Sequence, residues 1–206
     1  MSKLIEKHLS IDLLTNTLRE IKNNTPTKKN KSPALNKSKL DFLNQTKNKN
    51  KNNYTEEINY ATKYQVTNLY ATSLDGTMVP LTLVEKATNI TLKLVKPVLI
   101  IGYGAYGVCV PVYYDPQYTV LLEKGWILAF AHCRGGGELG VSWHHQGKGG
   151  MKKNTFHDFI ACVRYLLDNE VTIPSKLCAM GGSAGGLIMG VMLNEYPEYF
   201  AGVIMR

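Results

Sequence analysis

Residues 180–186 read Met-Gly-Gly-Ser-Ala-Gly-Gly, which places a serine at position 183 between glycines at 181 and 185. A short apolar run, 177–180, precedes this Gly-x-Ser-x-Gly pattern, and a helix is expected to begin at Leu187. A strand, a sharp turn and a helix are the setting of a nucleophile elbow, whose strained backbone lifts the serine hydroxyl out at the carboxyl end of a sheet. Glycines on both sides allow the close backbone contacts that this turn requires. The stretch therefore predicts a serine hydrolase.

The chain around this stretch alternates between strand and helix patterns. Apolar runs at 98–101, 126–131 and 202–205 are typical of buried parallel strands, and helices are expected at 118–124 and 154–170. Thr155 and Asp158 have the spacing of a capping box at the start of the second helix. Residues 66–73 and 78–84 alternate about an Asp75-Gly76 turn, which predicts a hairpin. The pattern predicts an α/β protein with a mostly parallel sheet and flanking helices.

The net charge of +8 comes from one segment. Residues 22–51 contain nine lysines and a single acid, Asp41, so this segment accounts for the whole net charge. It is rich in Asn and poor in apolar residues, which predicts a disordered insertion over residues 22–53. An electrostatic arm for nucleic acid or an anionic membrane is the alternative, but no aromatic residues alternate with the lysines to stack on bases. We expect no nucleic-acid partner and no membrane partner.

The cysteines and the first residues bear on the compartment. The four cysteines form no Cys-x-x-Cys pair and have apolar sequence neighbours, which predicts buried free thiols in a reducing compartment. Residues 1–8 lack the apolar core of a signal peptide, and no apolar run approaches the roughly 18 residues of a membrane span. The sequence predicts a cytoplasmic protein.

Two glycine-rich loops follow the strands expected at 98–101 and 126–131. Residues 102–107 (Gly-Tyr-Gly-Ala-Tyr-Gly) have dinucleotide-binding spacing, but 108–111 is a poor helix start and no acidic residue follows at the required distance. Residues 134–138 (Arg-Gly-Gly-Gly-Glu) carry charge, and we expect a structural role for them, with Arg134 paired internally. Neither loop has the Gly-Lys-Ser/Thr of a P-loop. No cofactor and no metal ion are expected.

Four motifs then occur in a fixed order: 102–107, 134–138, Trp143-His144 and 181–186. This order resembles the prolyl oligopeptidase family of serine peptidases over residues 64–206, and more weakly over 9–21. The runs 152–156 and 179–186 are most similar to the oligopeptidase B branch of that family. The resemblance implies part of an α/β-hydrolase peptidase domain, which in the family is capped by a β-propeller. It assigns 1–21 to a remnant propeller hairpin, 22–53 to an insertion, and 54–206 to the N-terminal part of the catalytic domain.

The resemblance also implies roles for particular residues. Ser183 would form an acyl-enzyme with short peptide substrates. The backbone N–H of Ala184, the residue after the nucleophile, is one expected oxyanion donor. The family implies the hydroxyl of Tyr103 as the second donor and Tyr106 as a residue of the substrate pocket. Because 108–115 contains a single acid, Asp115, cleavage after basic residues is not predicted.

The triad base is absent from this sequence. In an α/β-hydrolase the nucleophile, the acid and the histidine follow one another along the chain, yet all five histidines, His144 and His145 included, precede Ser183. Only 23 residues follow the serine, so we expect a C-terminally truncated chain whose acid and histidine lie beyond it. Two other interpretations stay open: an esterase-like hydrolase on the same scaffold, and a catalytically inactive fragment. A sheet cut after the strand at 202–205 is also expected to aggregate through its open edge.

Overall fold

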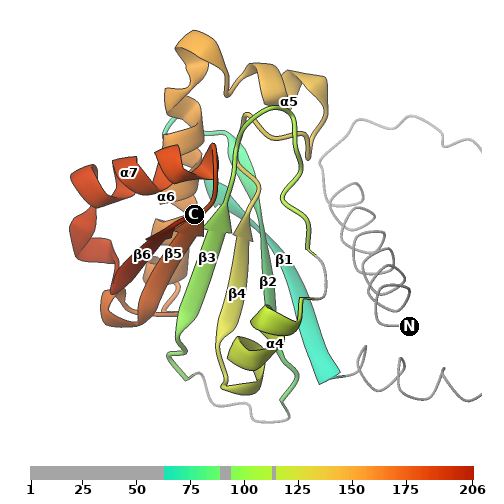
Figure 1. Cartoon of the computed structure of the whole chain (residues 1–206), viewed down its shortest axis with the longest axis vertical. Coiled ribbons are helices and arrows are strands. Elements are labelled where there is room, and N and C mark those ends of the chain that lie inside the picture. The colour runs from blue at the N-terminus through green and yellow to red at the C-terminus, as the bar shows by residue number, and fades with distance from the viewer. Residues whose placement is uncertain (1–62, 89–93, 113–114) are drawn as a thin grey trace, which may run out of the picture.

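The computed structural model describes residues 63–88, 94–112 and 115–206, and within them six strands form one sheet (Figure 1). The strands are β1 Tyr64–Thr72, β2 Met78–Lys86, β3 Val98–Gly102, β4 Ile127–Ala131, β5 Leu177–Gly181 and β6 Gly202–Met205. The α-helices are α4 Pro116–Glu123, α5 Val141–His145, α6 Lys153–Asp168 and α7 Gly185–Glu195. Short 3-10 helices cover Gly149–Met151, Pro174–Lys176 and Pro197–Tyr199.

The sheet is mixed, with the order β1-β2-β4-β3-β5-β6. Strands β4, β3, β5 and β6 run parallel, while β1 and β2 form the antiparallel hairpin predicted around Asp75-Gly76. The Asp75 carboxylate accepts a hydrogen bond from the Thr77 N–H at 3.1 Å, a local contact that stabilises such turns. The predicted α/β fold with a mostly parallel sheet and flanking helices is confirmed.

Alternate residues of the central strands enter two separate cores. One core lies against α6 and α7, and the other lies against α4 on the opposite face (Figure 1). The first takes Val98, Ile100, Ile127, Ala129, Leu177 and Ala179, and the second takes Leu99, Ile101, Leu128, Phe130 and Met180. Strands buried on both faces are apolar throughout, which is why their sequences read as continuous apolar runs.

The three expected helices begin before their predicted first residues, α6 by a single residue. Helix α4 starts at Pro116 because Asp115 caps it, accepting a hydrogen bond from the Gln117 N–H at 2.8 Å. Helix α7 starts at Gly185, directly after the serine turn. The capping box predicted for α6 is wrong. Thr155 and Asp158 lie within α6 and not at its first residue, and both are buried. Their side chains form hydrogen bonds with Arg134, in the segment that follows β4.

Several predictions fall outside the described residues. These are the hairpin at 9–21, the insertion at 22–53 and the domain boundaries between them. Within the described part of the chain, β6 pairs with β5 and has no neighbour on its other side. Its side chains Ile204 and Met205 are 46% and 57% exposed, and aggregation through this edge stays a prediction. Across the same residues, no helix combines the length and apolar character that a membrane crossing requires.

Candidate active site

Ser183 occupies a sharp turn between the end of β5 and the start of α7. Its φ is +50°, in the left-handed region that is unfavourable for a residue with a side chain. Two backbone hydrogen bonds hold the turn: the Ser183 N–H donates to the Arg206 carbonyl at 2.8 Å, and the Gly186 N–H donates to the Ser183 carbonyl at 3.0 Å. The side chain is exposed at the carboxyl end of the sheet. The strained serine turn expected from the sequence is confirmed.

The two flanking glycines are required by close backbone approach. A Cβ at Gly181 would collide with the Gly185 carbonyl group. A Cβ at Gly185 would lie 2.6 Å from the Gly102 carbonyl oxygen and 3.3 Å from the Tyr103 Cα. A Cβ at Gly182 would meet nothing nearer than 3.6 Å. Close backbone contacts therefore explain why positions 181 and 185 of the motif are glycine. The missing side chain at 185 also lets Tyr103, the residue after β3, approach the start of α7.

The predicted oxyanion donors lie on either side of this contact. Ala184 immediately precedes α7, and its N–H makes no hydrogen bond among the residues that the structure describes. Tyr103 follows β3, is half-buried, and packs against the core that lies under α4. Its Cα approaches Gly185, two residues from Ser183, so the structure brings Tyr103 and Ala184 to the same end of the sheet. Their roles as donors stay predictions.

Tyr106 lies on the same loop, three residues after Tyr103. Its side chain is 77% exposed, and its φ is +57°, an unusual value for an aromatic residue. The loop is closed by hydrogen bonds from the Gly107 N–H to the Gly135 carbonyl at 2.9 Å and from the Val108 N–H to the Ala105 carbonyl at 3.0 Å. The exposed aromatic ring on this loop is accessible from solvent, and its role in a substrate pocket stays a prediction.

Arg134 is the centre of a buried ionic cluster. The residue is 2% exposed, and its guanidinium donates to Asp158 at 2.7–3.2 Å and to Asp75 at 2.6 and 3.1 Å. Ser73 donates to Asp158 at 2.6 Å, and the Arg134 N–H donates to the same carboxylate at 2.9 Å. The hydrogen bonds from Arg134 hold the pKa of Asp75 well below its ordinary value. Internal pairing of Arg134 is confirmed, and it ties the loop after β4 to α6 and to the β1–β2 turn.

None of the described histidines is hydrogen-bonded to Ser183, whose hydroxyl has no partner among the described residues. His132 is buried, 2.9 Å from the Thr82 hydroxyl and 3.4 Å from the Glu138 carboxylate. Nδ1 of His144 is bonded to the Gly135 carbonyl at 2.9 Å. These contacts belong to the loop after β4, in agreement with the expectation that no histidine here is the triad base.

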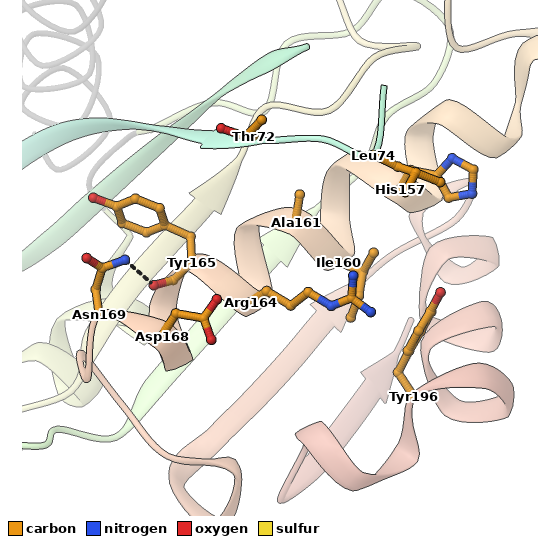
Figure 2. Close-up of a pocket in the computed structure, with 10 residues that line it drawn as sticks. All are labelled: Thr72, Leu74, His157, Ile160, Ala161, Arg164, Tyr165, Asp168, Asn169 and Tyr196. Atoms are coloured by element: carbon orange, nitrogen blue, oxygen red, sulfur yellow. Dashed lines mark hydrogen bonds between the residues drawn. The ribbon is translucent and has the colours of Figure 1, made fainter. Parts of the chain in front are cut away.

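A cavity of about 470 Å³ lies beside α6 and the β1–β2 turn (Figure 2). The Arg164 guanidinium lies 5.8 Å from the centroid of the Tyr196 ring at one side of it. His157 is half-buried and lines this cavity. The lining contains neither Ser183 nor the tyrosines of the loop after β3, so the cavity is separate from the elbow.

The four cysteines are free thiols with different environments. Cys133 and Cys162 are buried, and burial raises the pKa of both thiols. Cys178 is half-buried. The prediction of burial is wrong for Cys109, which is exposed, because it lies on an irregular segment and not in a strand. Among the described residues, no group of three or more His, Cys, Asp or Glu side chains could hold a metal ion.

The sequence assigned no role to Lys152 and only a capping box to Thr155, yet both side chains bind the loops that follow β3 and β4. Lys152 donates from Nζ to the Gly104 carbonyl at 2.6 Å, and Thr155 donates to the Arg134 carbonyl at 2.7 Å. Asp75 was assigned only to a hairpin turn, yet it binds Arg134, 59 positions away. The run 152–156, which contains Lys152 and Thr155, carried part of the family resemblance, but no local spacing relates any of these residues to its partner.

The comparisons with known proteins agree with this geometry. Residues 112–206 match the model described as the prolyl oligopeptidase family. "Protease 2" of Moraxella lacunata is 41% identical over 138 residues, which are 66% of this chain and 20% of that protein. "Prolyl endopeptidase-like" of Homo sapiens is 39% identical over 142 residues, 69% of this chain and 19% of that protein. Oligopeptidase B from Trypanosoma brucei, solved in its closed form with covalently bound antipain, is 40% identical with a TM-score of 0.67, covering 70% of this chain and 20% of that structure. The chain thus spans about a fifth of the length of the relatives that it matches.

Proposed function

The chain belongs to the prolyl oligopeptidase family, and on that basis we propose that it carries the nucleophile of a serine peptidase that cleaves short peptides. Ser183 Oγ attacks the carbonyl carbon of the scissile peptide bond, its proton passes through a general base to the departing nitrogen, the C–N bond breaks to release the amine product, and an acyl-enzyme forms on Oγ. Water then hydrolyses this ester and frees the serine. The N–H of Ala184 and the hydroxyl of Tyr103 stabilise the oxyanion, and Tyr106 contacts the substrate.

The observation that carries this proposal is the backbone of Ser183. A φ of +50° is a strained conformation, and such strain persists only where the surrounding structure enforces it. Here the enforcement comes from the close contacts at Gly181 and Gly185. The result is an exposed serine next to the Ala184 N–H, which makes no hydrogen bond within the described part of the chain, and an acyl-transfer site needs this arrangement.

The reaction also needs a general base. A serine hydroxyl is a weak nucleophile at neutral pH, and none of the described histidines bonds to it. The proposal therefore includes a histidine and an acid from outside the described residues. Without them, the oxyanion donors and substrate binding would leave only residual catalysis.

The proposal extends to the setting of the reaction. All four cysteines are free thiols, which supports a reducing compartment and a cytoplasmic location. The partners proposed are short peptides, with no nucleic acid and no membrane. No preference for a residue at the cut bond is assigned.

A fluorophosphonate probe tests the nucleophile directly. The samples are the 206-residue chain and the longest polypeptide encoded by the same reading frame, each compared with its Ser183→Ala variant. We expect labelling that Ser183→Ala abolishes and that the matched control Ser175→Ala, at an exposed serine in a 3-10 helix, leaves unchanged. No labelling in either polypeptide would refute an active peptidase and favour an inactive fragment.

Substrate class is tested on the labelled polypeptide. We expect cleavage of short peptidyl amides. Hydrolysis of simple esters without any cleavage of peptidyl amides would replace the peptidase with an esterase-like hydrolase. Labelling that persists in Ser183→Ala would place the nucleophile elsewhere.

A further inference from the structure

The loop that carries Tyr103 is built on two supports. We call residues 103–107 the Tyr103 loop and residues 132–138 the Arg134 loop. The Gly104 carbonyl oxygen lies directly against the Cα of Gly135, since a Cβ there would collide with it. The Gly107 N–H donates to the Gly135 carbonyl at 2.9 Å. The two loops therefore stack backbone to backbone, and each loop has glycine at the positions that touch.

The second support is the start of α6. Nζ of Lys152 donates to the Gly104 carbonyl at 2.6 Å and to the Thr155 hydroxyl at 3.3 Å. Thr155 in turn donates to the Arg134 carbonyl at 2.7 Å, and its methyl group fills the space where a Cβ of Gly104 would lie. One helical turn thus holds both loops, and α6 itself is anchored in the core through Phe159, which is fully buried.

The environment of Lys152 is unusual for a cation. Its side chain is half-buried, and it has no carboxylate within ion-pair distance among the described residues. Burial lowers the pKa of its ammonium group. Its nearest polar contact is the Gly104 carbonyl, with the Phe156 ring 6.0 Å away. A charged donor makes a stronger hydrogen bond to a carbonyl than a neutral donor does. The ammonium charge of Lys152 therefore strengthens its hydrogen bond to the Gly104 carbonyl in the Tyr103 loop.

We propose that Lys152 is a positioning residue, which fixes the Tyr103 loop so that the Tyr103 hydroxyl is held in place beside Ser183. The peptide before Tyr103 is pinned where Gly102 contacts Gly185, and the peptide after Gly104 is pinned by Lys152. With both sides held, the Tyr103 backbone has little freedom to rotate. An oxyanion donor works only when it is placed before the charge develops, so this restraint contributes to catalysis. This inference rests on the proposed function for its catalytic part and not for the restraint itself.

Native-state hydrogen exchange of the 206-residue chain measures the restraint without any need for activity. The reporters are the N–H groups of Gly107 and Val108, both hydrogen-bonded within the stacked loops. We expect Lys152→Met to raise their exchange rates about tenfold, the effect of losing one charge-assisted hydrogen bond. The matched control is Lys153→Met, because Lys153 is exposed on the next position and should change nothing.

The exchange rate of a distant amide distinguishes loosening of the Tyr103 loop from destabilisation of the whole protein. The Gly76 N–H donates to the Ser73 carbonyl in the β1–β2 turn, and its exchange should stay constant in Lys152→Met. Equal acceleration at Gly76 and Gly107 would show a merely structural role and overturn the proposal, as would no acceleration at either. Should Lys152→Met prevent folding, Lys152→Gln, with a neutral donor of shorter reach, is read in the same way.

The catalytic part is tested by the rate of fluorophosphonate labelling in the polypeptide that labels. Lys152→Met should slow labelling about tenfold, and Lys152→Arg should restore part of the rate. In a Tyr103→Phe background, Lys152→Met should have no further effect, because the group that it positions is already gone. Independent effects of the two substitutions would refute positioning through Tyr103. Absence of wild-type labelling would refute the proposed function. The hydrogen-exchange result would still show whether Lys152 restrains the Tyr103 loop.

Discussion

A methyl group at position 185 tests the steric basis of the elbow. In Gly185→Ala the new Cβ would lie 2.6 Å from the Gly102 carbonyl oxygen and 3.3 Å from the Tyr103 Cα. Both neighbours are backbone atoms of a central strand and its loop, so neither can turn aside as a flexible side chain would. Ordinary contacts begin near 3.4 Å, so β3 and α7 must separate by about 0.8 Å at this point.

The expected cost follows from two opposing contributions. Forcing a backbone shift in a packed region costs about 3 kcal/mol, whereas replacing glycine by alanine in a helix contributes about 1 kcal/mol of stabilisation. We therefore expect Gly185→Ala to lower the free energy of unfolding by about 2 kcal/mol. The displaced Tyr103 backbone should also slow fluorophosphonate labelling of Ser183 about tenfold.

Two neighbouring glycines supply matched controls. Gly186 and Gly190 lie in the same helix, and a Cβ at either would meet nothing within 4 Å. Alanine at these positions should raise the free energy of unfolding by up to about 1 kcal/mol. Urea unfolding followed by tryptophan fluorescence measures all three variants. If Gly185→Ala is as stable as Gly186→Ala, the close approach of β3 to α7 does not explain the glycine at 185.

Three further predictions concern the buried groups. Hydrogen bonds from Arg134 lower the pKa of Asp75, so its stabilising effect is present above about pH 4, the ordinary value in an unfolded chain, and is lost as the pH falls through the lowered value. The difference in unfolding free energy between wild type and Asp75→Asn should narrow on acidification from pH 6 to pH 2; a constant difference would contradict this. Asp158→Ala leaves Arg134 buried without its main partner and should cost about 3–5 kcal/mol in urea unfolding, part of which Arg134→Met in the same chain should recover; strictly additive effects would argue against the pairing. A thiol reagent should modify the exposed Cys109 in the native chain long before the buried Cys162, and equal rates measured by peptide mass analysis would contradict the described burial.

The strand and helix pattern was predictable because it depends on local periodicity. Apolar runs gave the positions of β3, β4 and β5, since strands buried on both faces need apolar residues at successive positions. The first residues of α4 and α7 were less predictable, because the cap at Asp115 and the serine turn start those helices before their apolar pattern begins. The capping box at Thr155 failed for a related reason: a correct local spacing was used for contacts with the Arg134 loop.

The sequence by itself determined that this is an α/β protein with a strained serine turn at Ser183, because both features depend on residues that are neighbours in the chain. Only the tertiary structure decided that Lys152 binds the Gly104 carbonyl and that Asp75 and Asp158 share Arg134. These partners lie 24 to 59 positions apart, and they meet because β3 and β4 are adjacent in the sheet, while α6 and the β1–β2 turn lie against the loops that follow these two strands. Strand order follows from packing across the whole sheet, and no local pattern of residues encodes it.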